Sequence, residues 1–260
     1  MKNIAKIVLA AWILLSAIPG YAQQSTIKKS KMKHKKILFV LSSANKAGTT
    51  GEATGTWIEE FSSPYYYLLA KGADITIATP AGGAAPVDPK SQQPAYVTES
   101  VKKFNSDKAA RQQLNNTRKL ADINPADYDA VFYPGGHGPT WDLPQNEISI
   151  SIIESFYAQG KPVALVCHGP AALVNTKAPN GEPLVKGKKV SAFTNSEEQA
   201  GQTTAFVPFP LEDRLKELGA LYQRGADWQP FAVADGALIT GQNPASATEV
   251  AELLYQALSK

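Results

Sequence analysis

The sequence predicts an α/β protein built on a mainly parallel sheet with helices on both faces. From residue 37 onward, short apolar runs alternate with amphipathic segments, which is the order expected of strands joined by crossover helices. Some of the runs are apolar at nearly every position, as strands buried on both faces are. A third observation is a predicted strand, sharp turn and helix around the only cysteine, Cys167.

The composition is that of an ordinary globular protein: 260 residues, 43% hydrophobic and 19% charged. One cysteine cannot form a disulfide within the chain, and three histidines leave little material for a zinc site. The net charge of +3 arises from lysines in the first 36 residues, which contain no acid, so residues 37–260 carry a net charge of about −5. We therefore expect no metal and no nucleic-acid partner.

The N-terminus has the pattern of a secretory signal peptide. Lys2 and Lys6 precede an apolar stretch over 7–18, and Gly20 and Ala22 supply the small residues of a cleavage site. That stretch is too short for a comfortable membrane span. We therefore predict a signal peptide over 1–22, a basic linker over 23–36, one domain over 37–260, and an exported protein, periplasmic or secreted.

The first half of the domain is predicted to contain three strands and intervening helices. Helix 57–71 should begin or bend at Pro64 and end before Gly72. One or two polar helices are expected within 99–120. The strands are predicted over 36–43, 73–79 and 127–133, the last of them running into the glycine turn PGGHG.

The second half repeats the alternation. Helices are predicted over 145–159, 169–176 and 209–220, and a closing helix follows Pro244. Strands are predicted over 161–167 and 188–194. Asp235 and Gly236 indicate a hairpin between two short strands within 231–240.

The segment VALVCHGPAAL places Cys167 at the turn between a strand and a helix. A nucleophile at such a turn is exposed at the top of a sheet, and a helix N-terminus stabilises a thiolate. A buried cysteine that only packs is the competing interpretation. From this segment alone, both remain open.

Two further segments favour chemistry at Cys167. The glycines of PGGHG, residues 134–138, allow backbone N–H groups to face the site, where they and the amide of His168 would form an oxyanion hole. In TGTWIEEFSSP, Glu59 and Glu60 are adjacent and cannot face the same side of a helix. One of them should point inward as an acid or base, and the pattern does not say which.

Together, PGGHG, CHGPAAL, the TGxWxEExxxP segment and GQNPAS resemble the ThiJ/PfpI superfamily, and within it the heat-shock chaperone and glyoxalase III branch. The resemblance runs from about residue 36 to the C-terminus. It implies a flavodoxin-like fold, the one that class I glutamine amidotransferases share, with Cys167 at a nucleophile elbow. Homodimers are common in this superfamily, so a homodimer is a further expectation.

The resemblance also assigns site residues. It implies Cys167 as the nucleophile, with His168 beside it and Glu60 as the carboxyl that hydrogen-bonds the thiol. The oxyanion donors fall on the backbone of Gly136 and His168. An acidic residue that orients the histidine falls in AFTNSEEQA, where the spacing favours Glu198 over its neighbour.

The implied activity is that of a glutathione-independent glyoxalase, which converts methylglyoxal and other small 2-oxoaldehydes to 2-hydroxy acids without a cofactor. A cysteine hydrolase acting as deglycase, amidase or peptidase is an alternative, because a Cys-His-acid set also supports acyl transfer. A stress chaperone or a sensor of oxidation is the third possibility, since an exposed thiolate oxidises readily.

Overall fold

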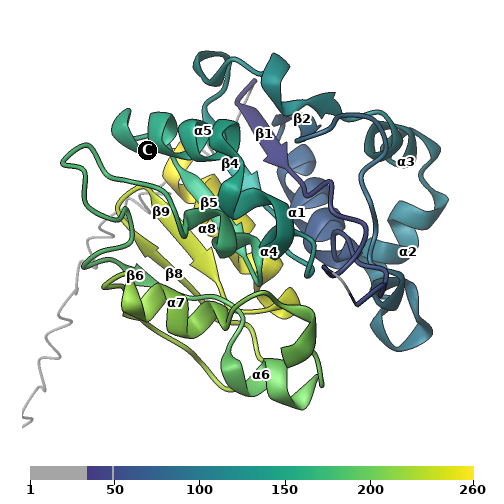
Figure 1. The fold of residues 1–260 in the computed structure, drawn as a ribbon. Helices are drawn as coiled ribbons and strands as arrows, with labels where there is room; N and C mark the ends of the chain where they lie inside the picture. The colour runs from purple at the N-terminus through teal and green to yellow at the C-terminus, as the bar shows by residue number, and fades with distance from the viewer. Residues whose placement is uncertain (1–33, 49) are drawn as a thin grey trace, which may run out of the picture. The chain divides into compact units, whose positions relative to one another are not determined.

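The computed structural model describes residues 34–48 and 50–260, which contain a mainly parallel seven-stranded sheet (Figure 1). The strand order is β3-β2-β1-β4-β5-β9-β8, and only the pairing of β8 with β9 is antiparallel. The strands are β1 (Lys36–Val40), β2 (Asp74–Thr79), β3 (Arg118–Lys119), β4 (Ala130–Tyr133), β5 (Val163–Val166), β8 (Ala232–Asp235) and β9 (Leu238–Gly241). The predicted fold class is confirmed.

Alternate residues of the central strands enter two separate hydrophobic cores, one on each face of the sheet. In β1, Ile37 and Phe39 face one core while Leu38 and Val40 face the other. The first core is closed by α1 (Ile58–Ala70), α2 (Glu99–Ser106), α3 (Lys108–Asn115) and α8 (Ala247–Leu258). The second is closed chiefly by α5 (Glu147–Ala158) and α7 (Leu211–Glu217). This burial on both faces explains why the central strands β4 and β5 consist of apolar and aromatic residues.

The remaining elements are short. A second sheet consists of β6 (Lys189–Val190) and β7 (Leu221–Tyr222), which are parallel. Two short helices, α4 (Pro139–Asp142) and α6 (Asn195–Ala200), follow PGGHG and the AFT segment. Single turns of 3₁₀ helix are η1 (Pro89–Gln92), η2 (Pro94–Tyr96), η3 (Leu120–Asp122), η4 (Pro125–Asp127), η5 (Leu143–Gln145), η6 (Gly169–Leu173), η7 (Thr204–Phe206) and η8 (Pro244–Ser246).

Two predicted elements differ from the structure. The helix expected over 169–176 is the 3₁₀ helix η6, held by i to i+3 bonds such as Ala171 N–H to His168 O. The strand expected over 188–194 pairs only over β6. Beyond it the chain leaves β7 and crosses the end of the main sheet, where the Phe193 amide donates to the carbonyl of Cys167.

The predicted domain boundaries stay predictions. The signal peptide and nearly all of the basic linker lie outside the described residues, and the described residues, 34–48 and 50–260, belong to one compact unit. Within the described part of the chain, no helix is long and apolar enough to cross a membrane.

The strand order brings the candidate site residues to one edge of the sheet. From β1 the chain goes to β2 on one side, and later to β4 and β5 on the other, so the direction of strand addition reverses beside β1. Ligand sites of open α/β sheets lie at the carboxyl ends of strands near such a reversal. Here PGGHG follows β4, Cys167 follows β5 and Asn243 follows β9.

Phe132, in the central strand β4, should be a main contributor to stability. Its ring is fully buried and stacks on Phe39 at a centroid distance of 4.8 Å. We expect Phe132→Ala to lower the free energy of unfolding by about 3–5 kcal/mol through lost burial and a residual cavity. The measurement is urea denaturation followed by circular dichroism. Leu221→Ala, at a residue that is 55% exposed, is the control and should change stability by less than about 0.5 kcal/mol.

Candidate active site

The backbone of Cys167 is held in a strained conformation at the end of β5. Its φ is 60°, a left-handed value that costs an L-residue other than glycine roughly 1–2 kcal/mol. The amide of Cys167 donates to Gly241 O (2.9 Å), and its carbonyl accepts from the Phe193 amide (2.9 Å). These bonds come from two other segments of the chain and keep the side chain, which is 3% exposed, at the edge of the sheet.

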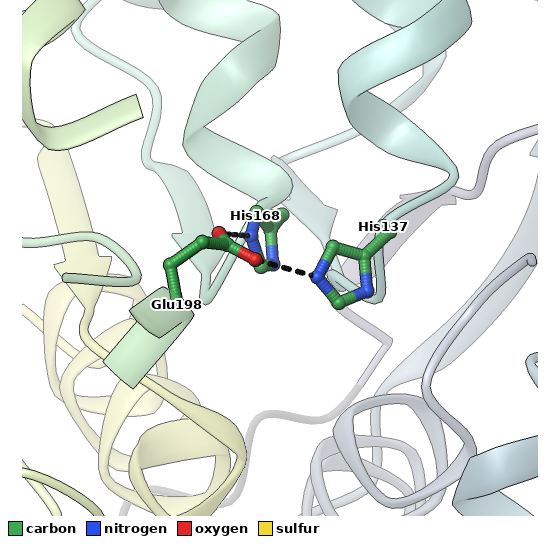
Figure 2. A group of neighbouring side chains, drawn as sticks. All are labelled: His137, His168 and Glu198. Atoms are coloured by element: carbon green, nitrogen blue, oxygen red, sulfur yellow. Dashed lines mark hydrogen bonds and ion pairs between the residues drawn. The ribbon is translucent and has the colours of Figure 1, made fainter. Parts of the chain in front are cut away.

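Glu198 bridges two histidines with its two carboxylate oxygens (Figure 2). His168 Nε2 lies 2.7 Å from Oε2, and His137 Nε2 lies 3.0 Å from Oε1. An ionised carboxylate only accepts hydrogen bonds, so we assign the proton of each ring to Nε2. Nδ1 of His168 then has a free lone pair, and it lies 3.4 Å from Sγ of Cys167.

The electrostatics of this cluster agree with that assignment. Burial raises the pKa of Glu198, but the neighbouring His168 and the hydrogen bonds from both histidines outweigh it and hold the pKa well below its ordinary value. Burial, followed by the nearby His137, lowers the pKa of His168, while Glu198 acts in the opposite direction. At neutral pH, His168 is therefore a neutral imidazole next to an ionised carboxylate.

Glu60 lies on the other side of the thiol. It is in the first turn of α1, is fully buried, and accepts the amide of Gly135 on Oε2 at 2.8 Å. Burial raises the pKa of Glu60 well above its ordinary value, although the Cys167 thiol and the Gly135 amide partly oppose this. Its other oxygen, Oε1, has no further hydrogen-bond partner among the described residues. Glu59 is only partly buried.

The expected thiolate stabilised by a helix N-terminus is not what the structure shows. Burial raises the pKa of the Cys167 thiol, and the charge of Glu60 would raise it further. The element after Cys167 is a five-residue 3₁₀ helix, whose dipole is weaker than that of a long α-helix. The resting thiol is therefore protonated, and the nearby base, His168, is what can remove its proton.

Two backbone amides lie near the sulfur. The Gly136 amide forms a hydrogen bond with the Cys167 side chain, which lowers the thiol pKa against the effect of burial. The amide nitrogen of His168 approaches PGGHG so closely that a Cβ on Gly135 would stand 2.7 Å from it. The structure thus brings the backbone of Gly136 and His168 next to Cys167. Their role as an oxyanion hole stays a proposal.

The sequence reasoning missed His137 and the walls of the cavity. His137 was not among the predicted site residues, but it shares Glu198 with His168 across 61 positions of the chain. The signal was its place in PGGHG, directly after a strand end. The cavity has a volume of about 250 Å³, and aromatic rings supply much of its lining.

His137, His168 and Glu198 also form a set that a transition metal could use. Their ligand atoms lie within 4.8 Å of one another, and two imidazoles with one carboxylate suit zinc or iron. Each histidine Nε2 is also within hydrogen-bond distance of Glu198, at 2.7 Å for His168 and 3.0 Å for His137, so the three residues satisfy each other as they stand.

Replacing Glu198 should weaken His168 as a base. In Glu198→Gln the carboxylate charge that raises the pKa of His168 is absent, so the ring should titrate at a lower pH than in the wild type. NMR titration of the His168 ring measures this shift, and kcat should fall by roughly 10²-fold or more. The control is Glu217→Gln at an exposed ion pair. An unchanged His168 titration would contradict the assigned contacts.

Position 135 should tolerate only glycine. A Cβ there would lie 2.7 Å from Glu60 Oε2 and 2.8 Å from Val166 O. Gly135→Ala should destabilise the fold by about 1–3 kcal/mol and displace Glu60. Thermal melting and thiol alkylation rates measure the two effects. Gly181→Ala, where nothing lies within 4 Å of the added Cβ, carries backbone strain alone and should keep the wild-type alkylation rate.

Comparison with known proteins places this geometry in a family. The profile of the DJ-1/PfpI family matches residues 53–257. Glyoxalase 3 of Candida albicans is 33% identical over 226 residues, which cover 84% of this chain and 95% of that protein. The glutathione-independent glyoxalase HSP31 of Saccharomyces cerevisiae is 30% identical and covers 87% of this chain and 99% of its own.

A solved structure is similar over nearly its whole length. The X-ray structure of Rapid Encystment Protein 24 KDa of Francisella tularensis superposes with a TM-score of 0.82 at 38% identity, covering 86% of this chain and 99% of that one. The crystal structure of glyoxalase III from Candida albicans gives a TM-score of 0.80 at 32% identity, covering 87% of this chain and 98% of that one.

The prediction of an exported protein is wrong by this comparison. The Candida and Saccharomyces relatives, which the chain matches over nearly their full length, are cytosolic glyoxalases. The pattern of charged, apolar and small residues over 1–22 lies outside the described residues, and no signal peptide is shown. The resemblance inferred from PGGHG and the cysteine elbow, in contrast, is confirmed: the chain belongs to the DJ-1/PfpI family.

Proposed function

We propose that the protein is a glutathione-independent glyoxalase that converts methylglyoxal and related 2-oxoaldehydes to 2-hydroxy acids such as D-lactate. The observation that carries this proposal is the pair of acid-base systems on either side of Cys167. His168 with Glu198 suffices to activate a thiol for acyl transfer. A glyoxalase must also move a proton between adjacent carbons, and the buried Glu60 carboxyl beside the sulfur supplies a group for that task.

The first step is attack of the sulfur on the aldehyde carbon. Nδ1 of His168, 3.4 Å from Sγ, takes the thiol proton as the S–C1 bond forms. The resulting imidazolium lies 2.7 Å from the carboxylate of Glu198, which favours its positive charge. The amides of Gly136 and His168 hold the negative aldehyde oxygen, which then takes the proton from His168 to give a hemithioacetal.

The second step moves hydrogen from C1 to C2. Glu60, in its ionised form, removes the C1 proton, and the C2 oxygen takes a proton from protonated His168 or water, which gives an enediol. Glu60 then returns the proton to C2 while the C1 hydroxyl gives its proton back to the same carrier, so C1 is oxidised to a thioester and C2 is reduced to an alcohol. The raised pKa makes Glu60 a stronger base than an exposed glutamate. Water then cleaves the thioester, restores the thiol and releases the 2-hydroxy acid. The net reaction converts one 2-oxoaldehyde and one water to one 2-hydroxy acid, and the proposed steps use no metal or organic cofactor.

The other activities considered make different demands on the same residues. A deglycase, amidase or peptidase needs Cys167, His168 and Glu198 but has no evident use for a second buried carboxyl. A chaperone needs none of the four side chains. Of these activities, only the glyoxalase proposal uses Glu60 as well as the triad. The homodimer and the domain boundaries at residues 22 and 36 also stay proposals, which sedimentation and N-terminal sequencing would check.

The test is lactate formation from methylglyoxal in the absence of glutathione. Cys167→Ala should abolish it because no hemithioacetal can form. Glu60→Gln should lower kcat by roughly 10²–10⁴-fold through loss of the proton shuttle. Treatment of the wild type with a chelator should leave the rate unchanged.

Glu99→Gln, at an exposed glutamate that starts α2, is the matched control for Glu60→Gln. Full lactate production by Cys167→Ala would refute the proposal. Lactate production by Glu60→Gln at the wild-type rate, combined with hydrolysis of acyl substrates by the wild type, would favour the hydrolase.

A further inference from the structure

The cavity beside Cys167 has aromatic walls from two distant parts of the chain. Trp57 and Tyr96 form an edge-to-face pair at a centroid distance of 5.0 Å, and Phe193 and Trp228 form another at 5.7 Å. All four residues line the cavity. The Phe193 ring lies 4.5 Å from the ring of His168, so this wall extends to the reacting atoms.

Trp228 is held in place at a cost in backbone strain. Its φ is 63°, a left-handed value that a bulky residue rarely adopts, and its side chain is 48% exposed. Burial in the core therefore does not explain its conformation. Backbone outliers of this kind persist where the surrounding structure fixes them, and they concentrate at functional sites.

Glu197 is the group that fixes Trp228. Its carboxylate is fully buried, and Oε1 accepts the amide of Trp228 (2.8 Å) and the side-chain amide of Asn243 (2.8 Å). Oε2 accepts the amide (3.2 Å) and hydroxyl (2.9 Å) of Thr194. Thr194 follows Phe193 directly, so one carboxylate ties the backbone of both aromatic wall residues together.

We propose that the site takes 2-oxoaldehydes with an aryl or similarly bulky apolar substituent in preference to methylglyoxal, with Trp228 as a specificity-determining residue and Glu197 as the residue that positions it. This rests on the proposed glyoxalase function. Methylglyoxal has five non-hydrogen atoms and leaves much of a 250 Å³ cavity to water. Phenylglyoxal has ten, and its ring gains edge-to-face and offset contacts with the walls.

The reaction is the same for the larger substrate. The sulfur of Cys167 bonds to the aldehyde carbon of phenylglyoxal, the C1 hydrogen moves to C2, and water cleaves the thioester to give mandelate. Only the substituent on C2 differs between the two substrates. A difference in kcat/KM between the two substrates that depends on Trp228 therefore measures the contact of the C2 substituent with the aromatic wall.

The experiment compares kcat/KM for phenylglyoxal and methylglyoxal, with mandelate and lactate measured as products. In the wild type we expect a ratio of about tenfold or more in favour of phenylglyoxal. Trp228→Ala should lower the ratio by about tenfold because the ring contacts are lost, and intrinsic aldehyde reactivity cancels in this comparison. Any non-glycine residue bears the strain at position 228, so alanine tests the ring itself.

Leu221→Ala is the matched control, since Leu221 is 55% exposed and is not among the residues that line the cavity. It should keep the wild-type ratio. Glu197→Gln provides a second test, because an amide has one acceptor oxygen and cannot satisfy both the Trp228 and Thr194 amides. Glu197→Gln should lower the phenylglyoxal-to-methylglyoxal ratio as Trp228→Ala does. The separate variant Trp228→Phe, which keeps an aromatic ring, should have a ratio between those of Trp228→Ala and the wild type.

A wild-type ratio near one, or a ratio that Trp228→Ala leaves unchanged, would overturn the inference while lactate formation upholds the glyoxalase proposal. Absence of both products from the wild type would overturn the two together. A melting temperature for each variant shows that a changed ratio belongs to folded protein.

Discussion

The carboxylate of Glu198 is the constraint on which the active-site chemistry depends. Because an ionised carboxylate only accepts, its two oxygens fix the protons of His137 and His168 on Nε2. The free Nδ1 of His168 then faces the sulfur. If this carboxylate were protonated or displaced, the tautomer would no longer be determined, and the thiol, which burial keeps protonated, would lack a defined base.

The sheet supplies the precision that this arrangement requires. Glu60 comes from the first turn of α1, which packs on one core, and Glu198 comes from the short helix α6 after the AFT segment. Cys167 is held between them because its amide donates to the Gly241 carbonyl and its carbonyl accepts from the Phe193 amide. Groups supported by rigid strands and helices keep catalytic geometry better than groups on free loops.

Sequence reasoning reached those features that local patterns encode. Runs buried on both faces predicted the parallel sheet, and the strand-turn-helix pattern with PGGHG led to Cys167 and to an oxyanion hole that includes the His168 amide. The choice of Gly136 among the glycines came from the family resemblance. Glu60 and Glu198 could be separated from their neighbours only by the family pattern, because adjacent glutamates on a helix look alike in a single sequence. The contacts of His137 and Trp228 could not be predicted, since their partners, Glu198 and Glu197, lie 61 and 31 positions away in the sequence. Export was inferred from composition near the N-terminus alone, with no physical link to the fold, and that inference failed.

The bond from the Cys167 amide to the Gly241 carbonyl has a consequence for biosynthesis. It joins the elbow after β5 to a residue of β9 that lies 74 positions later in the chain. The ribosome has therefore made Cys167 well before β9 can pair with β5, and Asn243 comes later still. A nascent chain has the cysteine before it has the conformation that presents it. The reactive conformation thus forms together with the sheet that protects it.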